Sequence, residues 1–465
     1  MEADSRSPVH EIVNALWRAL HELGSPAATS DIERWGFSIH AALSAAGREF
    51  HNHDHVVDMT AEGDPLEMIA ALYHDAVYIQ VDQGPPRSMR AELDSVLAAT
   101  DAGWRVLPHA AGPPTGDVLG VFDRKVGDVV TPTTGLNEFA SALVAAIQLA
   151  SALTREQRLC IAACIEQTIP FRVDPVTPLH DRLGRLGLEG ETLEEAVRRA
   201  VRVGNRDIEN FADNDPARFL DNTWKLLPES NPALHSPLVY TVRDYRIALQ
   251  KMEGFLSWLP AERVFHTWGD EPRPEIHARR VARTTGNLEL AVRYLRAKLY
   301  SIGLVEAIAE VTGGDVPLDY FMGGVKSPDR PARHRGGPVP AGDEPPADGL
   351  EKAKLVRIEQ FLPRMSHARD LDPPLHRLLT EGRASESSFD TRPSPLGAFL
   401  HATVGDAEVM RGVETAKKWW AGGMDAAAFL ASQPPRPVAA IARAAANIID
   451  TRRDRLFALA ERLER

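Results

Sequence analysis

Cysteine is nearly absent from this chain: Cys160 and Cys164 are the only two among 465 residues. Two thiols cannot build the disulfide framework of a small secreted scaffold. They lie four residues apart in an apolar run with helical spacing, so we expect buried structural thiols. Long uncharged apolar segments are also lacking, because three charged residues interrupt the nearest candidate at 143–165.

A signal peptide is missing from the visible N-terminus. The first residues are acidic and polar and contain no apolar core. Together with the lack of an apolar run that could span a bilayer, this predicts a cytoplasmic protein that does not enter a membrane.

Basic residues are too few to balance the acidic ones. The chain has 53 Lys and Arg against 65 Asp and Glu, a net charge of −12. Because an acidic surface repels a phosphate backbone, a general nucleic-acid-binding role is disfavoured. The hydrophobic fraction of 44% and the charged fraction of 25% are ordinary for a globular protein. At roughly 150 residues per domain, the length predicts two or three domains.

Histidine is concentrated in one stretch, 50–78, with the sequence FHNHDHVVDMTAEGDPLEMIAALYHDAVY. It holds His51, His53 and His55, and then the adjacent pair His74-Asp75 behind an apolar run. Imidazoles and a carboxylate grouped in this way are suitable ligands for a divalent transition metal.

The spacing of these residues has a geometric consequence. On a helix His51 and His55 lie one turn apart on the same face, and His53 is turned away by roughly 200°. His74 and Asp75 diverge by about 100° on the same geometry, so they can share an ion only over the edge of their helix. A second helix carrying His55 would then close the site.

Three motifs in order resemble those of a known family. They are Phe50-His51-Asn52-His53-Asp54-His55, then His74-Asp75-Ala76-Val77-Tyr78, and then Asn137-Glu138-Phe139-Ala140-Ser141-Ala142. This pattern is similar to the HD-domain metal-dependent phosphohydrolases, in particular the branch with aromatic-HNxxH, HDxVY and NExxSA motifs. The resemblance covers residues 10 to 225 and implies an all-α HD-domain fold.

The resemblance also implies a set of site residues. The metal ligands would be His55, His74, Asp75 and a later Asp, for which Asp207 is favoured. Asp213 and Asp215 compete with Asp207, but their sequence is more typical of a turn before a helix. The resemblance places the following side chains on the substrate: His51, Asn52, Asn137 and Ser141.

The third motif and one departure from the pattern bear on catalysis. In the family this motif lines the site, which implies that Glu138 either holds a water on the metal or orients the substrate. Glu138 also suits the first turn of a helix, where the helix dipole favours an acidic residue. The family often has a histidine three residues after the position of Thr168, where this chain has Phe171. A second metal site, or proton transfer by a histidine there, is therefore placed in doubt.

The expected domain organisation has three parts. Residues 1–327 form the HD-type domain, with a long irregular insertion at about 79–136 that serves either as a lid or as a surface decoration. Residues 328–349 are rich in proline and glycine, which predicts a solvated linker. Residues 350–465 form a helical module, which is a candidate for partner binding or for homo-oligomerisation.

These observations predict hydrolysis of a phosphate ester, with one divalent metal ion that the ligands do not distinguish among Mn, Mg, Fe, Zn and Co. Asp75 or Glu138 would take a proton from water, and Arg206 is the candidate cation for the phosphate. A nucleotide or signalling nucleotide is the substrate class that the resemblance implies. Two alternatives remain: an HD scaffold that binds a nucleotide and regulates a partner without turnover, and a helical platform whose histidines are purely structural.

Overall fold

The computed structural model describes residues 7–236, 238–324, 356–366 and 368–465. This part of the chain is predominantly helical, as predicted, with one small three-stranded sheet. The predicted linker at 328–349 lies outside the described residues. No helix within the described ranges is long and apolar enough to cross a membrane.

The contacts between residues divide the described chain into two units. Unit 1 holds residues up to 215 together with 259–288, and unit 2 holds 216–258 together with the residues from 289 onward. This grouping differs from the predicted domains, which placed 216–324 with the N-terminal part. The residues after the predicted linker pack against the part of that stretch that belongs to unit 2, 216–258 and 289–324: the Tyr240 hydroxyl donates to the Phe389 carbonyl at 2.6 Å, for example.

Unit 1 is built around a helix that is apolar on nearly all sides. This helix, α4, spans Pro65–Tyr73, and all but two of its residues are buried. Asp64 caps its start by accepting hydrogen bonds from the N–H groups of Leu66 and Glu67, and Pro65 occupies the first helical position. A short helix without a polar face is stable only inside a core. The neighbours that contact it are α1 (Pro8–Glu22), α3 (His53–Met59), α8 (Leu136–Gln148), α9 (Arg155–Gln167) and α11 (Gly190–Asp207).

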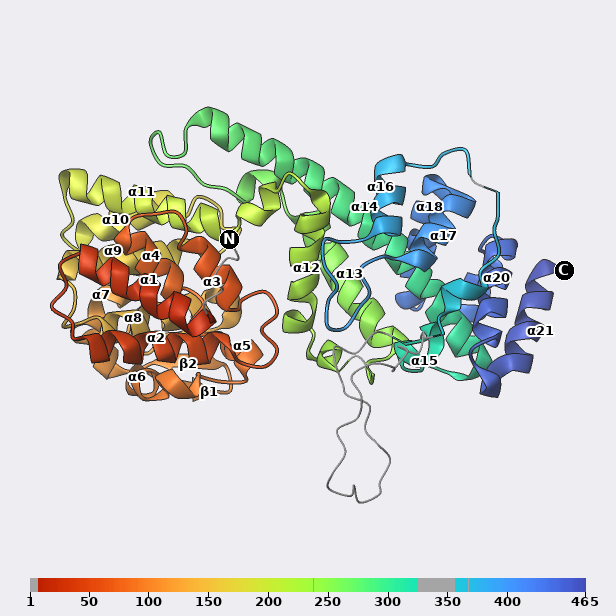
Figure 1. Ribbon diagram of the computed structural model, residues 1–465, viewed down its shortest axis with the longest axis horizontal. Coiled ribbons are helices and arrows are strands. Elements are labelled where there is room, and N and C mark those ends of the chain that lie inside the picture. The colour runs from red at the N-terminus through yellow and green to blue at the C-terminus, as the bar shows by residue number, and fades with distance from the viewer. Residues whose placement is uncertain (1–6, 237, 325–355, 367) are drawn as a thin grey trace, which may run out of the picture. The chain divides into compact units, whose positions relative to one another are not determined.

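The other helices of unit 1 complete this core (Figure 1). They are α2 (Thr29–Leu43), α5 (Ile79–Asp82), α6 (Arg90–Val96), α7 (Thr115–Val121) and α10 (Val176–Arg185). Helix α2 ends at Leu43. Gly47 follows with φ of 99°, a conformation that interrupts a helix. Cys160 and Cys164 are buried on α9, as predicted.

The insertion at 79–136 is not irregular. It holds α5, α6 and α7 and an antiparallel sheet of β1 (Leu97–Thr100), β2 (Gly103–Val106) and β3 (Val129–Val130). Gly103 makes the tight turn between β1 and β2, where φ is 141° and an added Cβ would lie 2.7 Å from the Val130 carbonyl oxygen. Apolar side chains of these elements belong to the core of unit 1. The insertion is therefore an integral part of the unit and not a detached decoration.

Unit 2 consists of helices from both sides of the undescribed residues 325–355. They are α12 (Pro216–Ser230), α13 (Val242–Trp258), α15 (Leu318–Met322), α16 (Pro373–Glu381), α17 (Pro395–Val404), α18 (Asp406–Trp420), α19 (Ala426–Ala431), α20 (Pro435–Ala446) and α21 (Arg453–Glu464). The longest helix, α14 (Pro274–Gly313), passes through the boundary between the units at 288. The alanine-rich face of α20 is buried and allows α21 to pack closely.

Candidate metal centre

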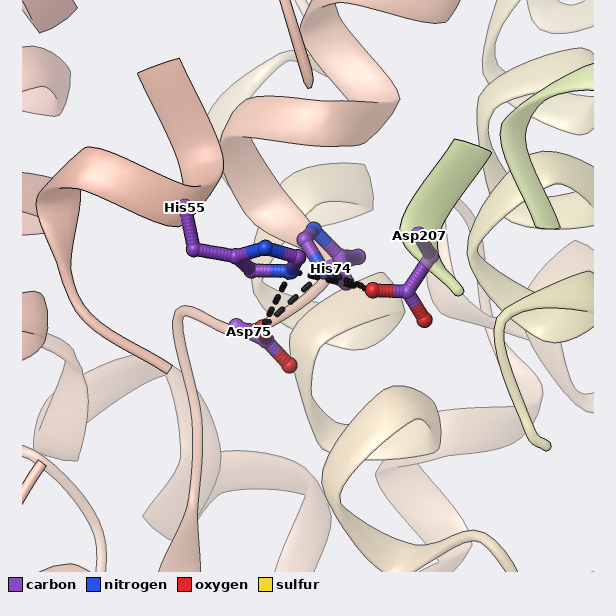
Figure 2. A group of neighbouring side chains, drawn as sticks. All are labelled: His55, His74, Asp75 and Asp207. Atoms are coloured by element: carbon purple, nitrogen blue, oxygen red, sulfur yellow. Dashed lines mark hydrogen bonds and ion pairs between the residues drawn. The ribbon is translucent and has the colours of Figure 1, made fainter. Parts of the chain in front are cut away.

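Four side chains that the sequence singles out meet in unit 1. His55, His74, Asp75 and Asp207 each offer one ligand atom, and these atoms all lie within 4.8 Å of one another (Figure 2). His55 comes from α3, the His-Asp pair from the end of α4, and Asp207 from the last residue of α11. Among the described residues this is the only group of histidines, cysteines and carboxylates with such spacing.

Asn52 places His55 in the group. Its side-chain oxygen accepts from the N–H groups of Asp54 and His55, which makes it the N-cap of α3. The helix therefore begins at His53, and the expectation that His51 and His55 share one helical face is wrong. His51 still lies beside the site, with its ring 4.8 Å from that of Tyr78 and 6.2 Å from that of His55.

The end of α4 fixes the orientation of His74. Its Nδ1 lies 2.8 Å from the carbonyl oxygen of Ala71, which can only accept, so Nδ1 carries the proton. Nε2 is thereby turned toward the other ligands, as a backbone carbonyl commonly does for a metal-binding histidine. The helix ends at Tyr73, so Asp75 is freed from helical geometry and its Oδ2 reaches 2.9 Å from His74 Nε2.

Asp207 closes the group, as predicted. Its Oδ1 lies 3.0 Å from His55 Nε2 and 3.4 Å from His74 Nε2. The competing residues Asp213 and Asp215 form a turn before α12, in which Asp213 accepts from the Asp215 N–H at 2.9 Å. They are not members of the group that could hold a metal ion.

Two buried atoms at the centre of the group lack a hydrogen bond. His74 Nε2 and Asp75 Oδ2 are 2.9 Å apart, yet neither has a partner with hydrogen-bond geometry. Buried polar atoms without a partner are costly, and they are rare in native proteins. Two imidazoles and two carboxylates facing one point match the donor set of a divalent metal, so the residues fit such an ion.

The electrostatics of the group favour a cation. Although burial alone would raise it, the imidazoles of His74 and His51 hold the pKa of Asp75 well below its usual value. Burial also opposes ionisation of Asp207, but the adjacent imidazoles of His55 and His74 lower its pKa to about 2. Conversely, burial disfavours a charged His74, while Asp75 and Asp207 raise the pKa of that ring well above its usual value. The two carboxylates therefore attract positive charge, either a proton on His74 or a metal ion. The proton and the metal ion compete for this place.

Two residues of the third motif hold the chain that follows Asp75. Asn137 Oδ1 accepts from the Ile79 N–H at 3.1 Å, and the buried Ser141 Oγ accepts from the Val77 N–H at 3.0 Å. Like Asn52, these two side chains accept hydrogen bonds from backbone N–H groups next to the candidate ligands. A direct contact of these three side chains with substrate remains a prediction.

Loss of the Ser141 hydroxyl should therefore reduce the stability of the fold. We expect Ser141→Ala to lower the free energy of unfolding by about 1–3 kcal/mol, because the buried Val77 N–H loses its acceptor. Urea unfolding measures this, with exposed Ser95, whose hydroxyl bonds only a carbonyl on its own helix, as the control position. Equal stability of Ser141→Ala and wild type would contradict the assigned contact.

Arg48 and Asp82 support the site in a way that the sequence did not reveal. Arg48 Nη1 donates to the carbonyl oxygen of Asp75 at 2.6 Å and to that of His51 at 3.4 Å. Its Nε and Nη2 donate to the Asp82 carboxylate at 2.9 and 2.6 Å, and both side chains are buried. The pair is 34 residues apart in sequence, and no local pattern marks it.

Arg206 is engaged elsewhere. Its Nη2 donates to the buried Glu67 at 2.9 Å and its Nη1 to the Met59 carbonyl at 3.3 Å. The adjacent residue Asp207 points to His55 and His74 instead, since neighbours on a helix diverge by about 100°. The contact of Arg206 with a phosphate remains a prediction.

Glu138 is an acidic residue whose carboxyl group has a strongly raised pKa. It lies in the first turn of α8 and is only partly exposed. Burial raises the pKa of Glu138 to about 7, and the nearby carboxylates of Asp75 and Asp207 contribute to this increase. A carboxyl group with a pKa near neutrality can both accept and release a proton under physiological conditions.

Comparisons of the chain with protein-family models, with curated proteins and with solved structures found no match. The likeness to the HD phosphohydrolases therefore remains an expectation from its three motifs. The function has to be argued from the geometry of the site.

Proposed function

We propose that this protein is a metal-dependent phosphohydrolase that cleaves a phosphate ester, with a nucleotide as the substrate class. The observation that supports this most directly is the convergence of His55, His74, Asp75 and Asp207 around two buried, unsatisfied atoms. The nucleotide class comes from the motif resemblance alone.

The four residues would hold one divalent ion, for which Mn, Mg, Fe, Zn and Co are all candidates. Such an ion lowers the pKa of a bound water and neutralises charge on phosphoryl oxygens. The chain fixes the ligands before the ion arrives: Asn52 caps the helix of His55, and the Ala71 carbonyl orients His74.

Glu138 is the better of the two candidate proton acceptors. Asp75 is a weak base because its pKa is held well below the usual value. Glu138 has a pKa of about 7 and therefore binds a proton more readily near neutral pH. We assign to Glu138 the removal of a proton from the attacking water.

His51 is a predicted substrate residue whose ring lies beside the candidate ligands, 6.2 Å from the ring of His55. Its ring contacts the rings of Phe50 and Tyr78, and its charge influences Asp75. Arg206 is already paired with Glu67. We therefore assign the contact with a phosphate oxygen to His51 in preference to Arg206.

A second function is favoured by two observations. Phe171 stands where the family often has a histidine, and Arg206 is engaged in an ion pair with Glu67. A site that holds a metal but lacks these groups suits a scaffold that binds a nucleotide and regulates a partner without turnover.

Phosphate release tests the proposal. The full chain is stripped with a chelator, supplied in turn with each of the five metals, and assayed with a panel of nucleotides and simple phosphate monoesters. We expect release that requires the metal and that is absent from Asp75→Ala. Metal binding without release from any substrate would favour the scaffold, and equal release by the stripped protein would contradict a metal-dependent reaction.

A further inference from the structure

Unit 2 contains a second buried group of charges, centred on Asp390. Four donors converge on its Oδ2 atom, from four side chains that are far apart in sequence. They are Lys298 Nζ at 2.7 Å, the Tyr245 hydroxyl at 2.7 Å, Trp224 Nε1 at 3.0 Å and Arg383 Nη1 at 3.3 Å. The ring of Trp224 also faces both cations, with Arg383 Cζ at 4.5 Å and Lys298 Nζ at 5.2 Å.

The charges of this group do not balance. Lys298 and Arg383 are 4% and 0% exposed, and both contact the carboxylate of Asp390. The buried Asp221 also favours the charged form of Arg383, but Asp221 is itself paired with Lys225 at 3.6 Å. The nearby Arg357 adds no net charge, because it forms an ion pair with Glu359. An uncompensated buried cation is expensive, and accordingly burial lowers the pKa of Lys298 to about 8. The group would gain stability from one more negative charge.

A small cavity adjoins the excess charge. Its volume is about 40 Å³, which is room for about three water molecules, and Lys298, Arg357, Asp390 and Ser394 line it. Of the three donors on the Lys298 ammonium group, one is used by Asp390, and no second acceptor contacts it in the part of the chain that the structure describes. Ser394 is 4% exposed, and its hydroxyl likewise has no hydrogen bond to any described residue.

The N-terminus of α17 meets the same cavity. Ser394 is its N-cap residue, but its side chain makes no capping bond, and Pro395 and Leu396 also line the cavity. Pro395 has no N–H, and the N–H groups of Leu396 and Gly397 have no acceptor among the described residues. Free N–H groups at a helix N-terminus attract an anion. The lysine, the serine and the helix end thus offer donors and positive charge to one small space.

We propose that this cavity is a binding site for a small free oxyanion of the size of inorganic phosphate. The anion would balance the excess positive charge at Lys298, accept from Ser394, and complete the first turn of α17. The cavity is too small for a nucleotide, so the ligand is distinct from the substrate proposed for unit 1. The inference is independent of the phosphohydrolase reaction.

Binding of inorganic phosphate to the full chain tests the site. A chelator is present throughout, so that no metal in unit 1 can hold the anion, and sodium chloride at matched ionic strength is the reference. We expect phosphate to raise the thermal unfolding midpoint and titration calorimetry to give one site. Sulfate should act in the same way, and adenosine monophosphate should have no effect. No effect of phosphate beyond that of chloride would overturn the proposal.

Two substitutions locate the site. Lys298→Met keeps the length of the side chain and leaves Arg383 and Asp390 as a balanced pair, so the fold should persist while phosphate affinity falls by at least about tenfold. Ser394→Ala removes one donor and should weaken binding by a few-fold. His74→Ala, in the other unit, should leave phosphate binding unchanged. Phosphate binding that survives both Lys298→Met and Ser394→Ala would contradict the assignment.

Discussion

Glu138→Gln is expected to reduce phosphate release by about 10²–10⁴-fold while the metal content stays at the wild-type level. The amide has the shape of the carboxyl group but cannot take a proton from water. Glu138 is not one of the four metal ligands, so the ion should remain bound. Steady-state kinetics and elemental analysis of the same preparation measure both quantities.

The pH profile distinguishes a proton acceptor from a residue that only shapes the site. Glu138 must be ionised to act, so the rate of the wild type should fall as the pH drops through its pKa. Burial raises that pKa to about 7, and the positive charge of a bound metal would lower it, so the acidic limb should lie at or below pH 7. The variant should lack this limb.

Glu156→Gln is the matched control, because Glu156 is an exposed acidic residue in the first turn of the neighbouring helix α9. It should leave the rate and the pH profile unchanged. A Glu138→Gln variant with the wild-type rate, or with an unaltered acidic limb, would show that another group takes the proton.

Asp82→Asn should destabilise the protein by about 3–5 kcal/mol, because it leaves the buried guanidinium of Arg48 without its counter-charge. Both partners are almost completely buried, with side-chain exposures of 0% and 5%. The same change should weaken metal binding by about 10–100-fold, since Arg48 holds the carbonyl oxygen of the ligand Asp75. Urea unfolding and metal titration give the two values.

The exposed pair Arg34–Asp31 provides the control for this prediction. Its side chains are 69% and 38% exposed, and exposed ion pairs contribute only about 0–1 kcal/mol. Asp31→Asn should therefore be almost neutral and leave metal affinity unchanged. If Asp82→Asn behaved like Asp31→Asn in both measurements, Arg48 would not be a positioning residue for the site.

Compact motifs, together with the family resemblance that they carry, were enough to predict the candidate metal site. His55 and the His74-Asp75 pair stand in compact motifs, and α11 carries Asp207 at the end of a long amphipathic run. The mostly apolar α4 could be predicted to be buried because it has no continuous polar face to turn toward water. These features depend on neighbours a few residues apart.

Features that depend on distant contacts were not predicted. The start of α3 at His53 follows from the choice of Asn52 as a cap, which displaced His51 from the helix. The Arg48–Asp82 pair and the four donors on Asp390 join segments far apart in the chain. The apolar residues of the insertion at 79–136 gave no strand pattern long enough to indicate a sheet, because its strands have only two to four residues.

The amount of metal bound to the full chain tests the central claim most directly. Wild type, Asp207→Ala and Asp58→Ala are stripped, loaded with each of the five metals, freed of excess and analysed by elemental analysis. Asp58 is an exposed carboxylate on α3, the helix of His55, and is not a member of the group. The account predicts about one ion per chain for wild type and Asp58→Ala, and almost none for Asp207→Ala. A wild type that binds none of the metals, or an Asp207→Ala variant with the wild-type content, would contradict it.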